Sequence, residues 1–248
     1  MNEEKPKLPN VRRMFVPPSG FTYFDLDLDS ADLRTVAWES DCAFLKQCFR
    51  EGKKPYVEMG KEYFNDPSFS KKQEPAYTQF KSLCHGTNYL GQAVNMAGRI
   101  GLDVAKCIKV QEWYLKKCPE VSDWHSRIKR QMDTTRTVRN AFGYRRTFLE
   151  RIEGTIYNEA VAWIGQSTTS CIINRGLVAL DEFEEENHWS IFVKIQVHDS
   201  LVGVFPTADR EKCEAKIREL CTIEVPYADP FIMPVGLKFS EKSWGDCS

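Results

Sequence analysis

Two aspartates lie at the ends of separate strand-like runs, and their type and placement suit joint chemistry. Asp27 lies in the run 24–34, and Asp199 lies in the run 195–200. Paired carboxylates can hold two Mg²⁺ ions, which polarise the attacking and leaving oxygens in phosphoryl transfer. Each aspartate also has an ordinary explanation, because Asp27 precedes a helical pattern that it could cap and Asp199 falls in a hairpin turn.

A helical segment between these runs carries a mixed stripe of rings and positive charge. Tyr77, Lys81, His85 and Tyr89 recur at every fourth position and therefore share one face of a helix. A lysine ammonium suits a triphosphate, and flat rings suit stacking on a base or sugar. An exposed amphipathic helix would explain the stripe equally well without the aspartates. Taken with them, the stripe predicts a nucleotidyl-transfer site.

Composition indicates a folded chain with a local excess of positive charge. The 248 residues are 42% hydrophobic and carry a formal net charge of -1. Residues 127–151 nevertheless hold eight arginines and lysines against two acidic residues. Such a stretch is either a solvated basic face or a surface that contacts a nucleic-acid backbone, and the neighbouring motifs favour the second interpretation.

The cysteines and the hydropathy of the sequence indicate in which cellular compartment the protein is expected. The nine cysteines form an odd count without any C-x-x-C pair, so we expect reduced thiols and no structural zinc. No apolar run approaches the ~20 residues of a membrane helix, and no secretion signal opens the sequence. We therefore expect no membrane partner and a cytoplasmic location, in the host if a phage encodes the protein.

The elements that must position these residues form an α+β arrangement. A strand from Phe21 places Asp25, Asp27 and Asp29 on one face, and a hairpin over 189–205 carries His198 and Asp199 at its tip. The remaining pattern predicts an extended lead-in over 1–20, breaks over 51–75, a hairpin over 137–149, a solvated acidic loop over 181–187, a strand over 235–239, and helices over 31–50, 74–99 (interrupted near Gly86 and Gly91), 102–117, 121–135, 155–179 and 209–221. An antiparallel sheet would hold both aspartates, with a helical insertion between them.

Three segments resemble motifs A, B and C of family A DNA polymerases, the group that includes bacterial DNA polymerase I and phage enzymes. Motif A, commonly D-Y-S-Q-I-E-L-R, resembles residues 27–34. Motif B, commonly R-x3-K-x3-[FY]-x3-Y-G, resembles residues 77–90, and motif C, commonly Q-V-H-D-E, resembles residues 196–200. The order and spacing also agree with the family, and weaker similarity extends from about Pro9 to the C-terminus.

This resemblance implies a polymerase palm with an inserted helical fingers subdomain. Residues 1–40 would form the palm around motif A, residues 41–135 the fingers, and residues 136–248 the palm with the template-side helix and motif C. Only 26 residues precede Asp27, whereas family members place a thumb and usually an exonuclease domain there. We therefore expect a split or truncated polymerase of phage type, with the split favoured and a separate thumb and exonuclease chain as partner.

The implied activity is template-directed DNA synthesis, which adds deoxynucleotides to a primer 3′-hydroxyl. Two Mg²⁺ ions, or Mn²⁺ as a substitute, would be held by Asp27, Asp199 and the Leu28 carbonyl. The resemblance assigns the incoming deoxynucleoside triphosphate to Asp32, Lys81, His85 and Tyr89. It assigns the primer-template DNA to Arg145, Arg146, Gln166, Gln196 and His198.

Four departures from the family pattern keep other functions open. Tyr77 replaces an arginine, His85 replaces a phenylalanine or tyrosine, Asp32 replaces a glutamate that excludes ribonucleotides, and Ser200 replaces a glutamate of motif C. A single-subunit RNA polymerase core is one alternative, although the Asp32 carboxylate disfavours a ribose. A catalytically idle DNA-binding or scaffold subunit is another, although the retained Asp27, Lys81 and Asp199 argue against it.

Overall fold

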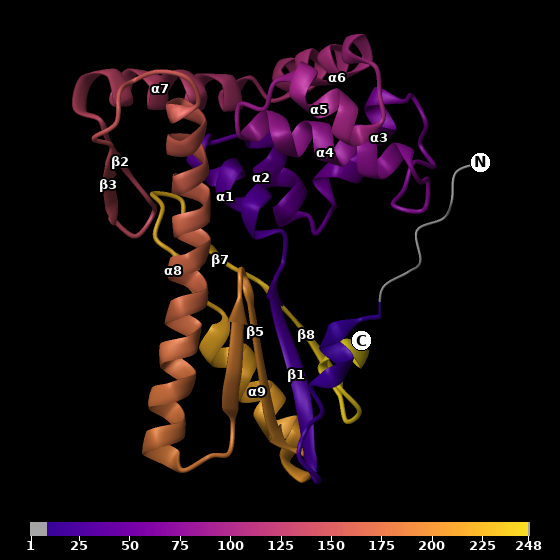
Figure 1. The fold of residues 1–248 in the computed structure, drawn as a ribbon, viewed down its shortest axis with the longest axis vertical. Helices are drawn as coiled ribbons and strands as arrows, with labels where there is room; N and C mark the ends of the chain where they lie inside the picture. The colour runs from indigo at the N-terminus through magenta and orange to yellow at the C-terminus, as the bar shows by residue number, and fades with distance from the viewer. Residues whose placement is uncertain (1–8, 248) are drawn as a thin grey trace. The chain divides into compact units, whose positions relative to one another are not determined.

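The computed structural model describes residues 9–247, whose chain divides into two compact units (Figure 1). The sheet unit consists of Met1–Ala31, Thr169–Val225 and Pro230–Ser248. The helical unit consists of Asp32–Thr168 and Pro226–Asp229. Each unit thus combines segments that are distant in sequence, and the palm and fingers boundaries given above stay a prediction.

A four-stranded antiparallel sheet, ordered β4-β5-β1-β8, forms the centre of the sheet unit. Its strands are β1 (Phe21–Leu28), β4 (Phe192–Val197), β5 (Ser200–Pro206) and β8 (Val235–Ser240). Side chains of β1 alternate between the two faces, so Phe24 and Leu26 are fully buried while Asp25 and Asp27 point to the other face. The predicted strands and their antiparallel pairing are confirmed.

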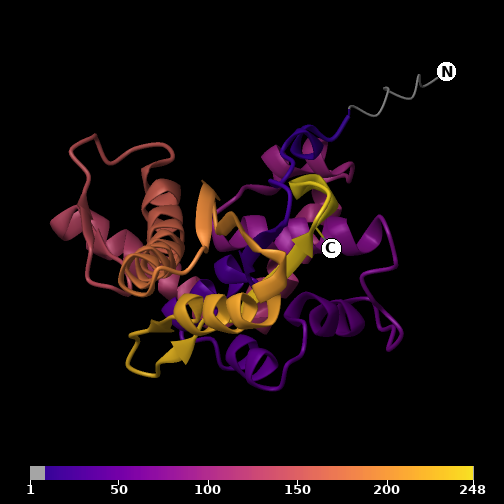
Figure 2. The same cartoon turned by 90° about the horizontal axis from the view of Figure 1, so that it is seen from below.

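Helices cover the apolar face of this sheet. They are α9 (Arg210–Cys221), which packs against β5 and β8, and the C-terminal part of α8 (Ile156–Asn187). A Cβ on Gly176 of α8 would lie 3.2 Å from the Cys221 sulfur, so glycine allows the two helices to approach closely. α9 leads into a short hairpin, β6 (Glu224–Val225) and β7 (Phe231–Ile232), as Figure 2 shows.

Short 3-10 turns from both ends of the described chain lie on the opposite face. They are η1 (Val11–Met14) and η3 (Trp244–Asp246), while a third, η2 (Thr207–Asp209), precedes α9. Trp244 packs in a cluster with Tyr23, Val202 and Val204. This cluster covers part of the face that carries the acidic residues of β1.

Helices build the helical unit around a mixed aromatic and aliphatic core. They are α1 (Ala31–Glu39), α2 (Ala43–Arg50), α3 (Pro55–Tyr63), α4 (Ala76–Asn88), α5 (Ala93–Ile100), α6 (Val104–Lys117), α7 (Pro119–Thr135) and the start of α8, with a small hairpin of β2 (Thr137–Arg139) and β3 (Arg145–Thr147). Phe80, Leu83 and Tyr114 are at most 2% exposed. The Tyr114 hydroxyl donates to Asn88 Oδ1 at 2.6 Å, so the core also satisfies a buried amide oxygen.

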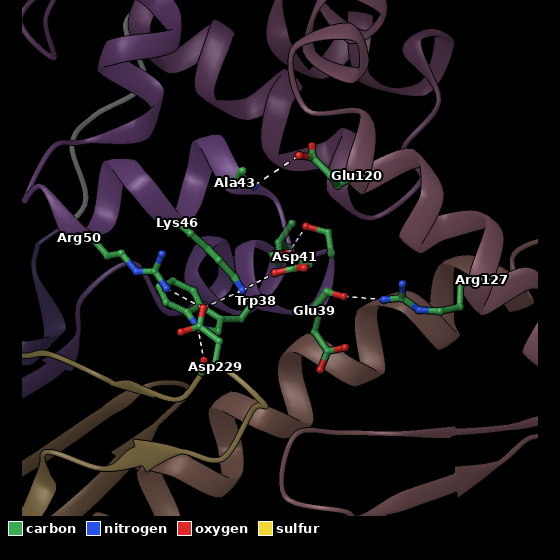
Figure 3. A network of polar contacts seen from close by, with 11 residues as sticks. Trp38, Glu39, Asp41, Ala43, Lys46, Arg50, Glu120, Arg127 and Asp229 are labelled. Atoms are coloured by element: carbon green, nitrogen blue, oxygen red, sulfur yellow. Dashed lines mark hydrogen bonds and ion pairs between the residues drawn. The ribbon is translucent and has the colours of Figure 1, made fainter.

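A polar network fastens the segment Pro226–Asp229 to α1 and α2 of the same unit (Figure 3). Lys46 Nζ and Arg50 donate to Asp229 Oδ2 at 3.0 and 2.6 Å, and the Trp38 indole donates to the Asp229 carbonyl at 2.7 Å. The Lys46 side chain is only 8% exposed, which requires such pairing. These contacts fix a loop that is 179 residues from Arg50 in sequence.

Several predicted elements were wrong in extent. The single helix expected over 31–50 is two helices, because Asp41 adopts a left-handed φ of 58° and Ser40 Oγ donates back to the Val36 carbonyl. The lead-in expected to be extended contains η1, and its residues 1–8 lie outside the described residues. Within the stretch 51–75, the missed helix α3 begins with Pro55, a residue that favours the first helical position.

The acidic loop expected over 181–187 is the last part of α8. Glutamates favour a helix as well as a loop when water solvates them. Phe183 anchors this end, because its ring meets Trp189 edge to face at 5.1 Å and Lys216 Nζ lies 5.0 Å from its centroid. Charge alone did not distinguish these two structures.

All nine cysteines lie within the described residues, and none of them is placed in a disulfide. Within residues 9–247, no helix combines the length and the apolar character that a bilayer span requires.

Candidate functional site

Backbone pairing in the sheet unit brings Asp27 and Asp199 together. Asp27 lies near the end of β1, directly opposite Ser200 of β5. His198 and Asp199 form the two-residue loop between β4 and β5, and His198 has the positive φ of 53° that tight hairpin loops require. The Leu28 N–H donates to the Asp199 carbonyl at 3.2 Å, which ties this loop to the end of β1.

The two carboxylates influence each other electrostatically. Desolvation and the nearby negative charge of Asp199 raise the pKa of Asp27, while the Ser200 hydroxyl and Lys238 oppose this increase. Ser200 Oγ donates to Asp27 Oδ1 at 3.1 Å. Because Asp27 is exposed as a residue, solvent moderates the shift. The serine that replaces the glutamate of motif C therefore holds an aspartate rather than adding a third carboxylate.

A cavity of about 450 Å³ opens over these residues. Its lining includes the predicted Asp27, His198 and Asp199, and also three charged residues to which the sequence analysis gave no role: Arg12, Asp25 and Lys238. The alternation of Asp25 with Asp27 was a visible signal. Nothing in the sequence placed Arg12 or Lys238 beside them, because they come from opposite ends of the chain.

Two other predicted residues lie outside this lining. The Gln196 side chain donates to Asn174 Oδ1 of α8 at 2.9 Å and therefore points to the helix-covered face. Leu28 is only 2% exposed as a residue, backbone included, and the contribution predicted for it is that of its carbonyl. The roles assigned to Gln196 and Leu28 stay predictions.

The residues of the cavity fit a hard divalent cation. Asp27 and Asp199 are close enough for one to raise the pKa of the other, and carboxylate oxygens are the ligands that Mg²⁺ prefers. Mg²⁺ keeps several waters and needs few protein ligands, so two carboxylates and a carbonyl suffice. Among residues 9–247 no group of three or more histidine, cysteine or acidic side chains is placed to hold one ion, and the metal site stays a prediction.

A second group of predicted residues meets within the helical unit. The Tyr89 hydroxyl donates to Asp32 Oδ1 at 3.1 Å, and His85 Nε2 lies 4.0 Å from Asp32 Oδ2. The rings of His85 and Tyr89 meet edge to face at 5.2 Å. Burial lowers the pKa of His85, Asp32 opposes this effect and Lys81 adds to it. Both oxygens of the Asp32 carboxylate therefore face a side chain of the motif B segment.

Glycine and asparagine on α8 hold Tyr89 in place. A Cβ on Gly165 would lie 3.3 Å from the Tyr89 hydroxyl, so glycine leaves room for the ring. Asn158 Nδ2 donates to the carbonyls of Tyr89 and Leu90 at 3.1 and 3.0 Å. These contacts stabilise the chain where α4 ends.

The stripe expected along the motif B helix is divided by burial. Tyr77 is only 8% exposed and packs near Phe69, whereas Lys81 is exposed to solvent. Tyr77 therefore belongs to the core of the helical unit and leaves Lys81 as the cation of this face.

The residues predicted to contact the template occupy the β2–β3 hairpin and the start of α8. Arg145 and Gln166 are exposed. Arg146 is 38% exposed, lies 4.2 Å from the Phe148 ring centroid and approaches Glu159 at 3.8 Å. These exposed polar side chains are available to a nucleic-acid backbone, and their role stays a prediction.

Known proteins that resemble this chain match nearly its whole length, and all of those described here are DNA polymerases. A family model described as DNA polymerase family A matches residues 2–246. A thermostable DNA polymerase I from Thermus filiformis is 26% identical over 240 residues, which cover 92% of this chain and 28% of that relative. A DNA polymerase of Mycobacterium phage D29 is 23% identical over 235 residues, which cover 95% of this chain and 37% of that relative.

A solved structure confirms the expected fold. The POL domain of Pol1 from M. smegmatis, in complex with DNA primer-template and dNTP, matches with a TM-score of 0.84 at 18% sequence identity. The match covers 94% of this chain and 42% of that one. The chain thus has the α+β fold of that domain and spans well under half the length of these relatives.

Proposed function

Because this chain belongs to DNA polymerase family A, we propose that it carries the nucleotidyl-transfer site of a template-directed DNA polymerase. The observation that supports this most is the convergence of Asp27 and Asp199 in one cavity of the sheet unit. The matched residues are only 28% and 37% of the two curated relatives described above, so the activity of a complete enzyme is part of the proposal.

In this proposal Asp27 and Asp199, with the Leu28 carbonyl, hold two Mg²⁺ ions or Mn²⁺ in their place. Such cations lower the pKa of a hydroxyl nucleophile and neutralise charge on a departing pyrophosphate. Ser200 orients the Asp27 carboxylate through its hydrogen bond, which leaves Asp27 Oδ2 for a cation. The chain's own contribution is a pair of carboxylates fixed by strand pairing.

The helical unit would bind the deoxynucleoside triphosphate. Lys81 would contact its phosphates as a point charge, and Tyr89 would lie by the nascent base pair. Tyr89 already holds the Asp32 carboxylate with a hydrogen bond, which supports Asp32 as the group that crowds a 2′-hydroxyl. His85, at 4.0 Å from that carboxylate, would face the sugar.

Each unit would contact DNA through polar side chains of its own. Arg145, Arg146 and Gln166 would contact the template strand, and His198 and Gln196 would lie near the primer terminus. A separate thumb and exonuclease polypeptide stays a prediction, which primer extension with and without such a polypeptide tests.

Primer extension with Mg²⁺ and deoxynucleotides tests the central proposal. We expect Asp27→Asn and Asp199→Asn each to reduce extension more than about 100-fold, because each removes an anionic ligand. Asp209→Asn is the matched control, since Asp209 is exposed and outside the cavity. In calorimetric titrations we expect Asp27→Asn and Asp199→Asn to weaken Mn²⁺ binding and Asp209→Asn to leave it unchanged. Extension that survives both cavity substitutions would contradict the proposal.

Nucleotide selection tests the RNA polymerase alternative. With Asp32 intact we expect deoxynucleotides to be incorporated in preference to ribonucleotides, and we expect Asp32→Ala to weaken that preference. A wild-type preference for ribonucleotides would favour the RNA polymerase instead.

A further inference from the structure

Two basic side chains line the cavity without a salt-bridge partner among the described residues. Arg12 and Lys238 are exposed and line the same cavity as Asp27 and Asp199. Within residues 9–247 neither of their side chains forms a salt bridge in the structure. Nearby Arg13, in contrast, pairs with Asp246 at 3.0 Å. Among the described residues, these two cations form no salt bridge with the carboxylates of the cavity.

Trp244 fixes the position of Arg12. The Arg12 guanidinium carbon lies 4.6 Å from the centroid of the Trp244 ring. The Trp244 indole donates to Asp25 Oδ2 at 2.9 Å, and Phe15 meets the ring edge to face at 5.7 Å. Arg12 is thus held over an aromatic ring that is itself hydrogen-bonded to the acidic face of β1.

Strand register places Lys238 on the same face. Lys238 of β8 lies opposite Asp25 of β1, and Gly236 lies opposite Asp27. Diagonal neighbours across strands are about 7 to 8 Å apart, which a lysine side chain can span. A Cβ on Gly236 would have only the Asp27 carbonyl within 4 Å, so no side chain crowds the strand position opposite Asp27.

The arrangement suits an anion that approaches the carboxylates from the side of β8. Arg12 and Lys238 supply two cations against the carboxylates of Asp25, Asp27 and Asp199. A phosphate near these acids needs such cations, because like charges repel over short distances. A nucleic-acid strand carries one phosphate for about every 3.4 Å along its axis, so a strand whose end reaches Asp27 places another phosphate close by.

We propose that Arg12 and Lys238 bind a backbone phosphate of the primer strand, close to its reactive 3′ end. The proposal rests on the proposed function, because the primer is the strand whose terminus must reach Asp27 and Asp199. It adds a binding site formed by the two ends of the described chain. Arg12 supplies a flat, stacked donor and Lys238 a mobile point charge.

Equilibrium binding provides the first test. We expect Arg12→Gln and Lys238→Gln to weaken binding of a fluorescent primer-template about three- to tenfold, and to reduce the slope of log affinity against log salt by about one. Arg13→Gln and Lys242→Gln are matched controls outside the cavity, and we expect them to change affinity less than twofold. Lys238→Arg keeps the positive charge, so we expect it to bind the primer-template as tightly as the unchanged chain does. Thermal unfolding of each variant excludes loss of the fold.

Primers with single methylphosphonate linkages identify the phosphate. With the unchanged chain, we expect a neutral linkage at one of the last three positions of the primer to weaken binding. With Lys238→Gln, we expect the same neutral linkage to cause no further loss of affinity. Equal losses at every linkage, or losses confined to the template strand, would overturn the inference. Wild-type affinity and salt slope in both variants would overturn it and leave the proposed function intact. Failure of the unchanged chain to bind or extend any primer-template would overturn both.

Discussion

The sheet unit and the helical unit position their candidate groups by different means. In the sheet unit, main-chain pairing of β1 with β5 places Asp27 opposite Ser200, and a backbone hydrogen bond ties Asp199 to Leu28. In the helical unit, Asp32 and Tyr89 meet through a side-chain hydrogen bond between separate helical segments. The carboxylate pair therefore depends on strand register, whereas the Asp32 group depends on the packing of helices.

This difference predicts which amino-acid substitutions each unit should tolerate. Register is specified by backbone atoms, so a small addition to a strand that contacts backbone has no room to relax. Helix positions are specified by side chains, so loss of one buried polar partner should matter more than a small addition on a helix surface. Matched substitutions in the two units can test this contrast.

The largest effect is expected from a methyl group in the central sheet. A Cβ on Gly203 of β5 would lie 2.3 Å from the Phe192 carbonyl oxygen and 2.6 Å from the Phe24 ring. We expect Gly203→Ala to lower the free energy of unfolding by about 3 kcal/mol, as overpacking does, and to weaken the Mn²⁺ binding proposed for Asp27 and Asp199. Urea unfolding and calorimetry measure the two effects. A loss below about 1 kcal/mol would show that the register can adjust.

A smaller effect is expected from removing one hydroxyl in the helical core. Tyr114 is fully buried, and its hydroxyl donates to Asn88, the residue before Tyr89. We expect Tyr114→Phe to cost about 2 kcal/mol of unfolding free energy, because the buried amide oxygen loses its donor. Tyr144→Phe is the control, since Tyr144 is 62% exposed. Equal stability of the two variants would contradict the view that side-chain contacts specify the helix positions in this unit.

The next effect is a dependence on pH in the helical unit. Burial raises the pKa of Glu39 to about 7, although the Tyr227 hydroxyl and Arg127 oppose the increase. The folded state then binds more protons than the unfolded state between about pH 4.5 and pH 7, so stability falls as pH rises through this window. We expect Glu39→Gln to remove about 1 to 2 kcal/mol of this fall. Urea unfolding at pH 5 and pH 8 measures it, and an unchanged pH profile would contradict the assignment.

The smallest effect is the helical counterpart of the first substitution. A Cβ on Gly98 of α5 would have nothing within 4 Å. We expect Gly98→Ala to stabilise the chain by about 0.5 to 1 kcal/mol, because alanine favours the helix and restricts the unfolded chain. Destabilisation measured by urea unfolding would show that α5 is as constrained as β5.

Strands and helices also differ in how well their extent can be predicted from sequence. Strand alternation predicted the faces of β1 correctly, since Asp25 and Asp27 are opposed to buried Phe24 and Leu26. Helical periodicity continued through residues 31–50 and could not show the break, which depends on the left-handed backbone of Asp41. Periodicity reports which side chains are apolar, and a single backbone torsion leaves no trace in it.

The candidate site was predictable to the extent that its members lie in local motifs. Asp27 and Asp199 were predicted because each lies near the end of a recognisable strand. The structure places both in the lining of one cavity, and their catalytic role stays a prediction. Arg12 and Lys238 were not found, because each is an ordinary basic residue until strand register and the Trp244 contact place it. Burial of Tyr77 was also missed, since aromatic residues suit an exposed stripe or a core equally well.

The sequence alone determined the strands of the central sheet and of the β2–β3 hairpin, most helices, the three motifs and the chemistry that two carboxylates and a lysine can support. Hydrophobic periodicity and residue chemistry act over a few neighbouring residues, so these features can be read locally. The sequence did not predict the short strands β6 and β7. Only the tertiary structure decided that Ser200 bonds Asp27, that Tyr89 holds Asp32, and that Arg12 and Lys238 line the cavity of the aspartates. Those contacts join residues between 57 and 173 positions apart or at opposite ends of the chain, and they exist only once the strands and helices have packed.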